Sequence, residues 1–124
     1  MNNVSVWKNG EKLAVKYLKK QGYTILETNA KNKIAEVDII CEKNDEIVFV
    51  EVKSRSNKNY GEAMEAVDIR KQRAYVKFSM AYVVAKLKAD KNIRFDVIEV
   101  YGEDINHIES AFDGDVMKKY VKRR

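Results

Sequence analysis

The chain has 124 residues, of which 45% are hydrophobic and 35% charged, a composition typical of one globular domain over residues 1–124. No apolar run approaches the roughly 20 residues that cross a bilayer, and charges interrupt the first 15 residues, so we expect a cytoplasmic protein without a signal peptide or membrane contact. One cysteine, Cys41, and one histidine, His107, exclude an internal disulfide and a Cys/His zinc cluster, which leaves oxygen ligands for any metal.

The balance of charge is basic, with 24 Lys and Arg against 19 Asp and Glu and a net charge of +5. This balance favours a polyanionic partner such as nucleic acid, but it also fits many ordinary basic proteins. The chain ends in "KKYVKRR", within a basic tail over about 112–124 that we expect to be flexible. The tail could be an arm that binds phosphates or a soluble end, and the sequence leaves both open.

The first predicted element is a helix over residues 5–21, because apolar residues recur at helical spacing, Ser5 is a suitable N-cap and Gly22 follows the end. A carboxylate, Glu11, interrupts the apolar stripe of this helix. Short segments rich in Val, Ile and Thr then predict consecutive strands at 23–29, 34–42 and 46–54.

Asp68 is a suitable N-cap for a second helix over 69–89. Strands follow at 93–101 and 104–110, with His107 expected on a strand surface. The order α-β-β-β-α-β-β predicts an α/β fold with one central mixed β-sheet flanked by helices. The expected inward face of the second helix consists of Ala74, Phe78, Ala81, Tyr82 and Ala85.

The second and third strands form the most informative hairpin. A tight turn centred on residues 44–45 would pair residues whose numbers sum to 89. Asp38 then lies opposite Glu51, and Glu36 opposite Lys53, on one face of the hairpin. The other face is apolar throughout and is predicted to consist of Val37, Ile39 and Cys41 against Val48, Val50 and Val52.

Two carboxylates opposed across a hairpin repel each other, so something must offset the pair Asp38 and Glu51. A shared proton, the ammonium of Lys53, or a divalent cation bound by both carboxylates would each do so. Mg²⁺ is suited to such a site because it prefers one or two carboxylates and keeps several waters. The simpler alternative is an exposed Glu–Lys ion pair on a solvated face, worth at most about 1 kcal/mol.

An aspartate on one strand, Glu-x-Lys on the next and a glutamate on the preceding helix resemble the PD-(D/E)xK nuclease superfamily, which includes Holliday junction resolvases. The residues in these positions are Glu11, Asp38, Glu51 and Lys53. The resemblance implies a restriction-endonuclease-like fold and catalysis with Mg²⁺ or Mn²⁺. It also implies that the three carboxylates are metal ligands and that Lys53 is a catalytic base or stabiliser of the transition state.

Longer blocks resemble one family of small bacterial proteins, the YraN-like family. They are "GEKLAVKYLKKQGYTILETN", "AEVDII", "VFVEVKSR", "YGEAMEAVDIRKQR" and "RFDVI", in the family's order within residues 7–98. The chain departs from the family pattern at Ala35, where the family usually has glycine, and its Cβ is expected to narrow the approach of a phosphate to the site.

Basic and polar side chains near the predicted site are candidates for binding nucleic acid. Three of them, Arg70, Arg73 and Lys77, recur at helical spacing and form one basic stripe, although such stripes are often simply solvated. Lys71 and Gln72 resemble polar helical positions that line the site in related nucleases. The expected contacts with nucleic acid are Arg55, Arg70, Lys71, Gln72, Arg73 and Lys77.

Three functions are consistent with the sequence. The first is an endonuclease that hydrolyses phosphodiester bonds in DNA, for which branched DNA is one candidate substrate and a homodimer one candidate assembly. The second is a non-catalytic nucleic-acid-binding protein that retains the nuclease fold. The third is a protein-interaction module in which Lys53 and Arg55 neutralise the remaining carboxylates.

Overall fold

The computed structural model describes residues 3–55 and 68–117, with side chains in the first stretch described from residue 9. No helix among these residues is both long and apolar enough to span a membrane. The elements, in chain order, are α1 (Asn3–Lys20), β1 (Thr24–Lys31), β2 (Glu36–Lys43), β3 (Glu46–Ser54), α3 (Ile69–Ala85), β4 (Asn92–Tyr101), β5 (Asp104–Phe112) and the 3₁₀ turn η2 (Gly114–Met117).

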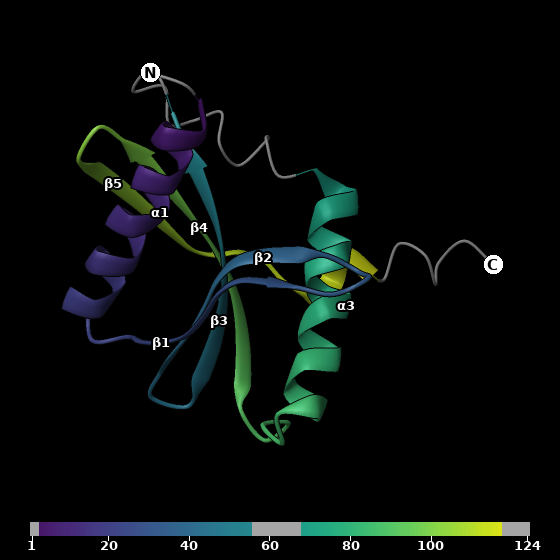
Figure 1. Ribbon diagram of the computed structural model, residues 1–124. Helices are drawn as coiled ribbons and strands as arrows, with labels where there is room; N and C mark the ends of the chain where they lie inside the picture. Colours follow the sequence, from purple (N-terminus) through teal and green to yellow (C-terminus); the bar gives the residue numbers. More distant parts are fainter. Residues whose placement is uncertain (1–2, 56–67, 118–124) are drawn as a thin grey trace.

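The five strands form one mixed sheet in the order β1-β2-β3-β4-β5, in which β3 and β4 are parallel and all other neighbours antiparallel. Helix α1 covers one face of the sheet and α3 the other (Figure 1). The predicted α/β class, the order of elements and the central mixed sheet with flanking helices are therefore confirmed.

Each face of the sheet has its own hydrophobic core. The core under α3 is rich in aromatic rings, with Phe49 in edge contact with Phe78 and Tyr82. The core under α1 contains the aliphatic side chains of the central strands. Its buried members are Ala14, Leu18, Tyr23, Ile39, Cys41, Val48, Val50, Ile98 and Val100.

The β2–β3 hairpin has the register that its turn predicts. Ile40 pairs with Phe49 and the next pair inward is Ile39 with Val50, while Asn44 has the positive φ of 56° that a tight turn requires. The pairing of β2 with β3 stops at Ile39 and Val50, one residue before Asp38 and Glu51. The strands separate at this point, and the opening between them becomes the site described below.

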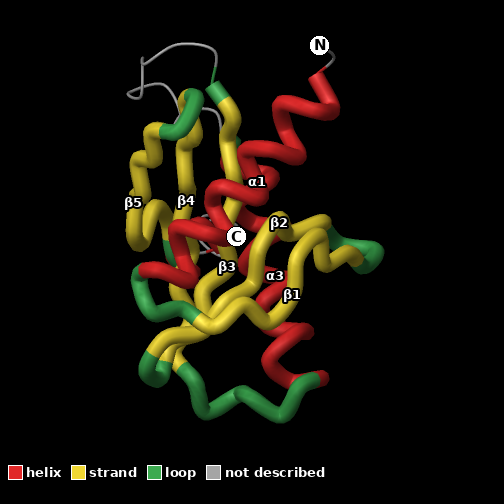
Figure 2. Tube along the Cα trace, turned by 60° about the vertical axis from the view of Figure 1, so that its left-hand side comes forward, coloured by secondary structure: helices red, strands yellow, loops and turns green. Residues whose placement is uncertain are grey.

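Two predictions about this hairpin were wrong. Glu36 does not pair with Lys53, because the pairing of β2 with β3 ends at Ile39 and Glu36 pairs only with Lys31 of β1. Val37 packs in the core under α3, whereas its predicted companion Ile39 packs under α1. The turn that joins β1 to β2 projects from the body of the molecule, as Figure 2 shows.

The helix ends follow local chemistry, with one exception. The side chain of Asp68 caps α3 by accepting a hydrogen bond from Lys71 N at 2.9 Å, and Gly22 has a φ of 95° just past α1. The predicted second helix was too long, because α3 ends at Ala85 and Leu87 has a φ of 56°. Its buried residues are Tyr75, Val76, Phe78, Ser79 and Val83, which makes the predicted inward positions Ala81 and Ala85 wrong, since both are exposed.

The last described residues, 112–117, lie within the region where the sequence predicts a tail. Residues 112–117 complete β5 and form η2, and Phe112 stacks on Phe95 with ring centroids 5.0 Å apart. The basic segment 118–124 of the expected tail, and the side chain of the predicted N-cap Ser5, lie outside the described residues.

A charged network on β4 and β5 fixes α1 to the sheet. Asp96, with no solvent exposure, accepts two hydrogen bonds from Arg94 at 2.8 and 2.9 Å and one from Ser110 N at 3.0 Å. His107 Nε2 lies 2.6 Å from Asp96 Oδ2, and its Nδ1 lies 2.9 Å from the Tyr17 hydroxyl on α1. The predicted surface position of His107 was therefore wrong, because its side chain is 7% exposed.

Candidate functional site

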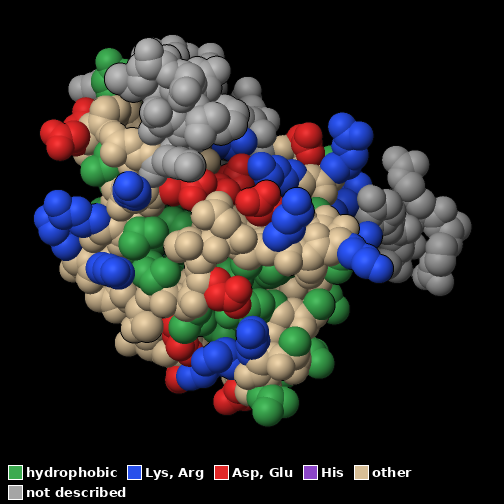
Figure 3. Space-filling model, in the orientation of Figure 1, with side chains coloured by type: hydrophobic (Ala, Val, Ile, Leu, Met, Phe, Trp, Pro, Cys, Tyr) green, Lys and Arg blue, Asp and Glu red, His purple; other side chains and the backbone are tan. Residues whose placement is uncertain are grey.

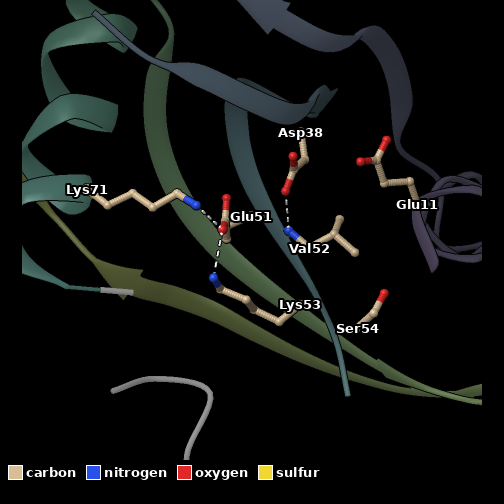
Figure 4. A pocket seen from close by; sticks show the side chains of 7 residues that line it. All are labelled: Glu11, Asp38, Glu51, Val52, Lys53, Ser54 and Lys71. Carbon is tan, nitrogen blue, oxygen red and sulfur yellow. Dashed lines mark hydrogen bonds and ion pairs between the residues drawn. The ribbon is translucent and has the colours of Figure 1, made fainter. Parts of the chain in front are cut away.

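A cavity of about 390 Å³ opens where β2 and β3 separate (Figure 4). Its walls come from α1, both strands of the β2–β3 hairpin and the first turn of α3, so three segments distant in sequence meet there. Acidic side chains gather in one hollow of the surface with basic side chains beside them, as Figure 3 shows. The lining residues are Glu11, Asp38, Glu51, Val52, Lys53, Ser54 and Lys71.

The side chain of Asp38 replaces a backbone carbonyl as hydrogen-bond acceptor at the end of the β2–β3 ladder. Its Oδ2 accepts a hydrogen bond from Val52 N at 2.8 Å, just past the last recorded backbone pair of β2 and β3. Burial, followed by the negative charge of Glu51, raises the pKa of Asp38 to about 7, although the bond from Val52 acts in the opposite direction. At neutral pH this carboxyl group is therefore poised between its charged and neutral forms.

Glu51, 3% exposed, is held by three donors. Its Oε2 lies 2.5 Å from Lys71 Nζ and 3.2 Å from Lys53 Nζ, while its Oε1 accepts a 2.5 Å hydrogen bond from the Tyr75 hydroxyl. Burial alone would raise the pKa of Glu51, but the hydrogen bonds from Lys71 and Tyr75 and the two positive charges outweigh it and lower the pKa. Glu51 is therefore the stable anion of the site.

Glu11 approaches the same cavity from α1 and, together with Glu51, contributes a charge that raises the pKa of Asp38. The preceding residue allows α1 to lie close to β3, because a Cβ at Gly10 would be 2.3 Å from Ser54 Oγ. The sequence predicted these acidic positions, and the structure brings Glu11, Asp38, Glu51 and Lys53 to one cavity.

The donor set is suitable for a hard divalent cation, since carboxylate oxygens are the ligands that Mg²⁺ and Mn²⁺ prefer. The present arrangement is not a finished metal site. Within residues 3–55 and 68–117, no three Asp, Glu, His or Cys side chains are close enough together to hold one ion. Two ammonium groups already neutralise Glu51, so a metal bound there would have to displace Lys71 or Lys53.

The expected nucleic-acid contacts divide into two groups. Lys71 points into the cavity, and Arg70 and Lys77 are exposed on α3. The remaining three lie outside the first cavity and are only partly exposed. Arg73 Nε donates to the carbonyl of Val116 at 3.0 Å, and the side chains of Gln72 and Arg55 are half-buried.

A second cavity of about 480 Å³ adjoins the first and shares Glu11, Asp38 and Lys71 with it. Ala35 lies in the wall of this second cavity and is partly buried against the core under α3. Any narrowing of the phosphate approach by its Cβ would therefore occur on this side of the site. The side chain of Asn32 fixes the turn before Ala35. Its Oδ1 accepts hydrogen bonds from Ile34 N at 2.7 Å and from Ala35 N at 3.1 Å.

The predictions from sequence missed two groups that complete the site. One is the hydroxyl of Tyr75, whose pKa is raised far above its ordinary value by burial and by the charge of Glu51. Tyr75 follows Lys71 by four residues, so both lie on one face of α3, and this spacing is the signal that could have identified it. The other is Val52 N, a backbone donor with no side-chain signature.

Several known proteins similar to this chain belong to one family. The family model described as "Uncharacterised protein family UPF0102" matches residues 10–100, a stretch that includes all the cavity-lining residues. A UPF0102 protein of Clostridium beijerinckii is 47% identical over 116 residues, which cover 89% of this chain and 94% of that protein. A UPF0102 protein of Clostridioides difficile is 46% identical over 114 residues, which cover 90% of this chain and 100% of that protein.

Proposed function

The chain belongs to the UPF0102 family, the YraN-like family, and from its cavity we propose that it is a metal-dependent endonuclease that hydrolyses phosphodiester bonds in DNA. One observation carries the proposal: carboxylates from α1, β2 and β3 line the same cavity as Lys53 and Lys71. Ion pairs that only stabilise the fold do not need to gather around an open volume of about 390 Å³.

The carboxylates fit a divalent cation in charge and chemistry. Asp38 has a raised pKa because burial and neighbouring anions disfavour its charge, and a cation ligated by Asp38 and Glu51 would offset that repulsion. Glu11 would supply the third oxygen ligand. When bound, Mg²⁺ or Mn²⁺ polarises the phosphate and lowers the pKa of a coordinated water.

The other side chains have roles that follow from their positions. Lys53 would face the phosphate and stabilise the negative charge that develops on it, or hold the attacking water. Tyr75 keeps the Glu51 carboxylate in one orientation through its hydrogen bond to Oε1. Lys71, together with the exposed Arg70 and Lys77 on the same helix, would bind phosphates on either side of the scissile bond.

Cleavage of defined DNA substrates tests this function. Purified protein should cut at least one of four-way junction, flap, linear duplex and single-stranded DNA in the presence of Mn²⁺ or Mg²⁺, and EDTA should stop the reaction. Asp38→Asn and Lys53→Met should each lower the rate by roughly 10²-fold or more, because each removes a group that acts on the transition state. Glu103→Gln removes an exposed carboxylate of the β4–β5 turn that lines neither cavity, and it serves as the matched control.

Metal binding can be measured without any substrate. Mn²⁺ at 100 times its dissociation constant should stabilise the folded protein by about 2.7 kcal/mol, because it binds the native state alone. The same titration of Asp38→Asn should give a much smaller shift. Cleavage that persists in EDTA, or in Asp38→Asn, would contradict the proposed chemistry.

A non-catalytic nucleic-acid-binding protein is the second candidate, supported by the two ammonium groups that neutralise Glu51. It predicts DNA binding with a steep salt dependence, no cleavage with any of the four substrates, and indifference to Lys53→Ala. Arg70→Gln combined with Lys77→Gln should then reduce the salt slope by about 2. Arg73 is left intact in this test because it holds η2 through Val116.

A further inference from the structure

Glu99 on β4 is an anomaly that the proposed function does not use. Its side chain has no solvent exposure, and its Oε1 accepts a 2.7 Å hydrogen bond from Asn106 on β5. Among the side chains that the structure describes, its Oε2 is the one buried polar atom without a hydrogen-bond partner. An unpaired buried carboxylate oxygen is costly, so its presence in the middle of a sheet requires a reason.

The position of Glu99 in the sheet suggests the missing partner. Glu99 pairs with Lys53 in the parallel β3–β4 ladder, and paired residues of neighbouring strands project from the same face about 4.8 Å apart. This is the face toward α3, since Glu51, two residues before Lys53, contacts Tyr75 on that helix. The unpaired oxygen therefore belongs to the residue that pairs with Lys53 across the β3–β4 ladder.

Lys53 needs a second acceptor if Glu51 binds a metal. In the present structure its ammonium lies 3.2 Å from Glu51 Oε2, an oxygen that Lys71 also contacts. A divalent cation at that oxygen would repel both ammonium groups and remove their shared acceptor. Without another carboxylate, Lys53 would move into solvent rather than stay over the reacting phosphate.

We propose that Glu99 is a positioning residue for Lys53. When a cation binds Glu51 and displaces the Lys53 ammonium, Oε2 of Glu99 accepts a hydrogen bond from that ammonium. Lys53 thus has two carboxylate partners on adjacent strands, Glu51 in the metal-free protein and Glu99 in the working site. The catalytic half of this inference rests on the proposed nuclease function, whereas the contact between Lys53 and Glu99 does not.

The contact can be tested without metal or DNA by a double-mutant cycle. Lys53→Met and Glu99→Gln are combined in two backgrounds, with Glu51 intact and with Glu51→Gln, and the unfolding equilibrium is measured in urea. With Glu51 intact, the two changes should be additive, because Lys53 is then paired with Glu51. With Glu51→Gln, the pair should show a coupling of at least fivefold in the unfolding equilibrium constant. Additivity in both backgrounds overturns the proposal, even if the protein cleaves DNA.

The catalytic role is tested on the active protein. Glu99→Gln should lower kcat at least tenfold with KM for DNA unchanged, and Glu99→Asp should recover part of the loss because it restores the charge. Glu103→Gln, an exposed carboxylate of the following turn, is the matched control and should leave kcat unchanged. Normal kcat in Glu99→Gln overturns the positioning role.

Mn²⁺ titration separates this role from metal ligation. The thermal shift that Mn²⁺ produces should be the same in Glu99→Gln as in the unmodified protein, because the proposed partner of Glu99 is Lys53. Loss of that shift would identify Glu99 as a metal ligand and overturn the proposal. If the unmodified protein cleaves no DNA, the nuclease function fails, while the double-mutant cycle still decides whether Lys53 reaches Glu99.

Discussion

Two aspartates, the half-buried Asp38 and the fully buried Asp96, show how differently one sheet treats the same side chain. The carboxylate of Asp96 accepts hydrogen bonds from Arg94 and Ser110 and contacts His107, and these partners outweigh burial, so its pKa is lowered. Asp38 accepts a hydrogen bond from Val52 N and faces other carboxylates, so its pKa is raised to about 7.

The difference shows which charge maintains the fold and which is available for chemistry. A buried charge that is fully paired holds elements together, because each partner would be left unsatisfied without it. A buried charge that is under-paired and faces a cavity destabilises the fold and is retained for another purpose. Mutation of each aspartate to asparagine should therefore have opposite effects on stability.

Asp96→Asn should cause the largest change. The substitution keeps the shape of the side chain but removes the charge that neutralises Arg94, whose side chain is only 14% exposed. We expect a loss of about 3 kcal/mol in the free energy of unfolding at pH 7, since Arg94 loses its buried partner and keeps only the more exposed carboxylates of Glu46 and Glu109. Urea denaturation measures it.

Asp45→Asn is the matched control for that measurement. Asp45 is also ion-paired, to Lys91 at 3.5 Å, but its side chain is 88% exposed. The control should change stability by less than about 0.5 kcal/mol. Equal effects of the two substitutions would contradict the structural role given to the Asp96 network.

Asp38→Asn should have the next largest effect, in the opposite direction. The folded protein binds the Asp38 proton more tightly than the unfolded chain, so stability is lost as pH rises from about 4 to about 7. Three pH units correspond to at most about 4 kcal/mol. We expect Asp38→Asn to stabilise the protein by about 2 kcal/mol at pH 8, since the asparagine oxygen can still accept from Val52 N.

The pH dependence distinguishes this effect from a change in packing. The stabilisation should disappear below about pH 4, where Asp38 is protonated in both the folded and unfolded states. Glu36→Gln on the same strand is exposed and should change stability by less than about 0.5 kcal/mol at either pH. Destabilisation by Asp38→Asn at pH 8 would show that this carboxylate is structural, like Asp96.

Local signals in the sequence predicted much of this arrangement. The turn at residues 44–45 set the hairpin register that brings Asp38 toward Glu51, and Asp68 marked the start of α3. Glu11 stood out because it interrupts an apolar stripe. These features depend on residues close in the chain, where helical and strand periodicity determine which side chains share a face.

The features that the sequence did not predict depend on contacts between distant segments. The pairing of His107 with Asp96 requires the β4–β5 ladder, whose register shifts between Phe95 and Val97. Val37 was placed on the wrong face because strict alternation along β2 fails between Val37 and Ile39, where pairing with β3 ends and pairing with β1 continues. Small alanines gave a misleading inward face for α3, since they indicate helix more strongly than they indicate burial.

Tyr75→Phe should give the smallest of the three stability changes and links the fold to the site. The substitution removes the hydrogen bond to Glu51 Oε1 and leaves that buried oxygen with one donor fewer. We expect a loss of about 1 kcal/mol at pH 7. Because this bond helps to lower the folded pKa of Glu51, its contribution is present above the unfolded value near 4.5 and fades as pH falls through the folded pKa.

Tyr82→Phe on the same helix is the control, because the Tyr82 hydroxyl is beside Glu27 rather than in the cavity. Comparing the two variants between pH 7 and pH 3 isolates the part of the loss that depends on Glu51. For Tyr75→Phe the destabilisation should shrink as Glu51 becomes protonated, and in the nuclease assay the acid limb of the rate should move to higher pH. A loss that is constant over this range would mean that Tyr75 serves the core alone and leaves the Glu51 carboxylate to be oriented by Lys71 and Lys53.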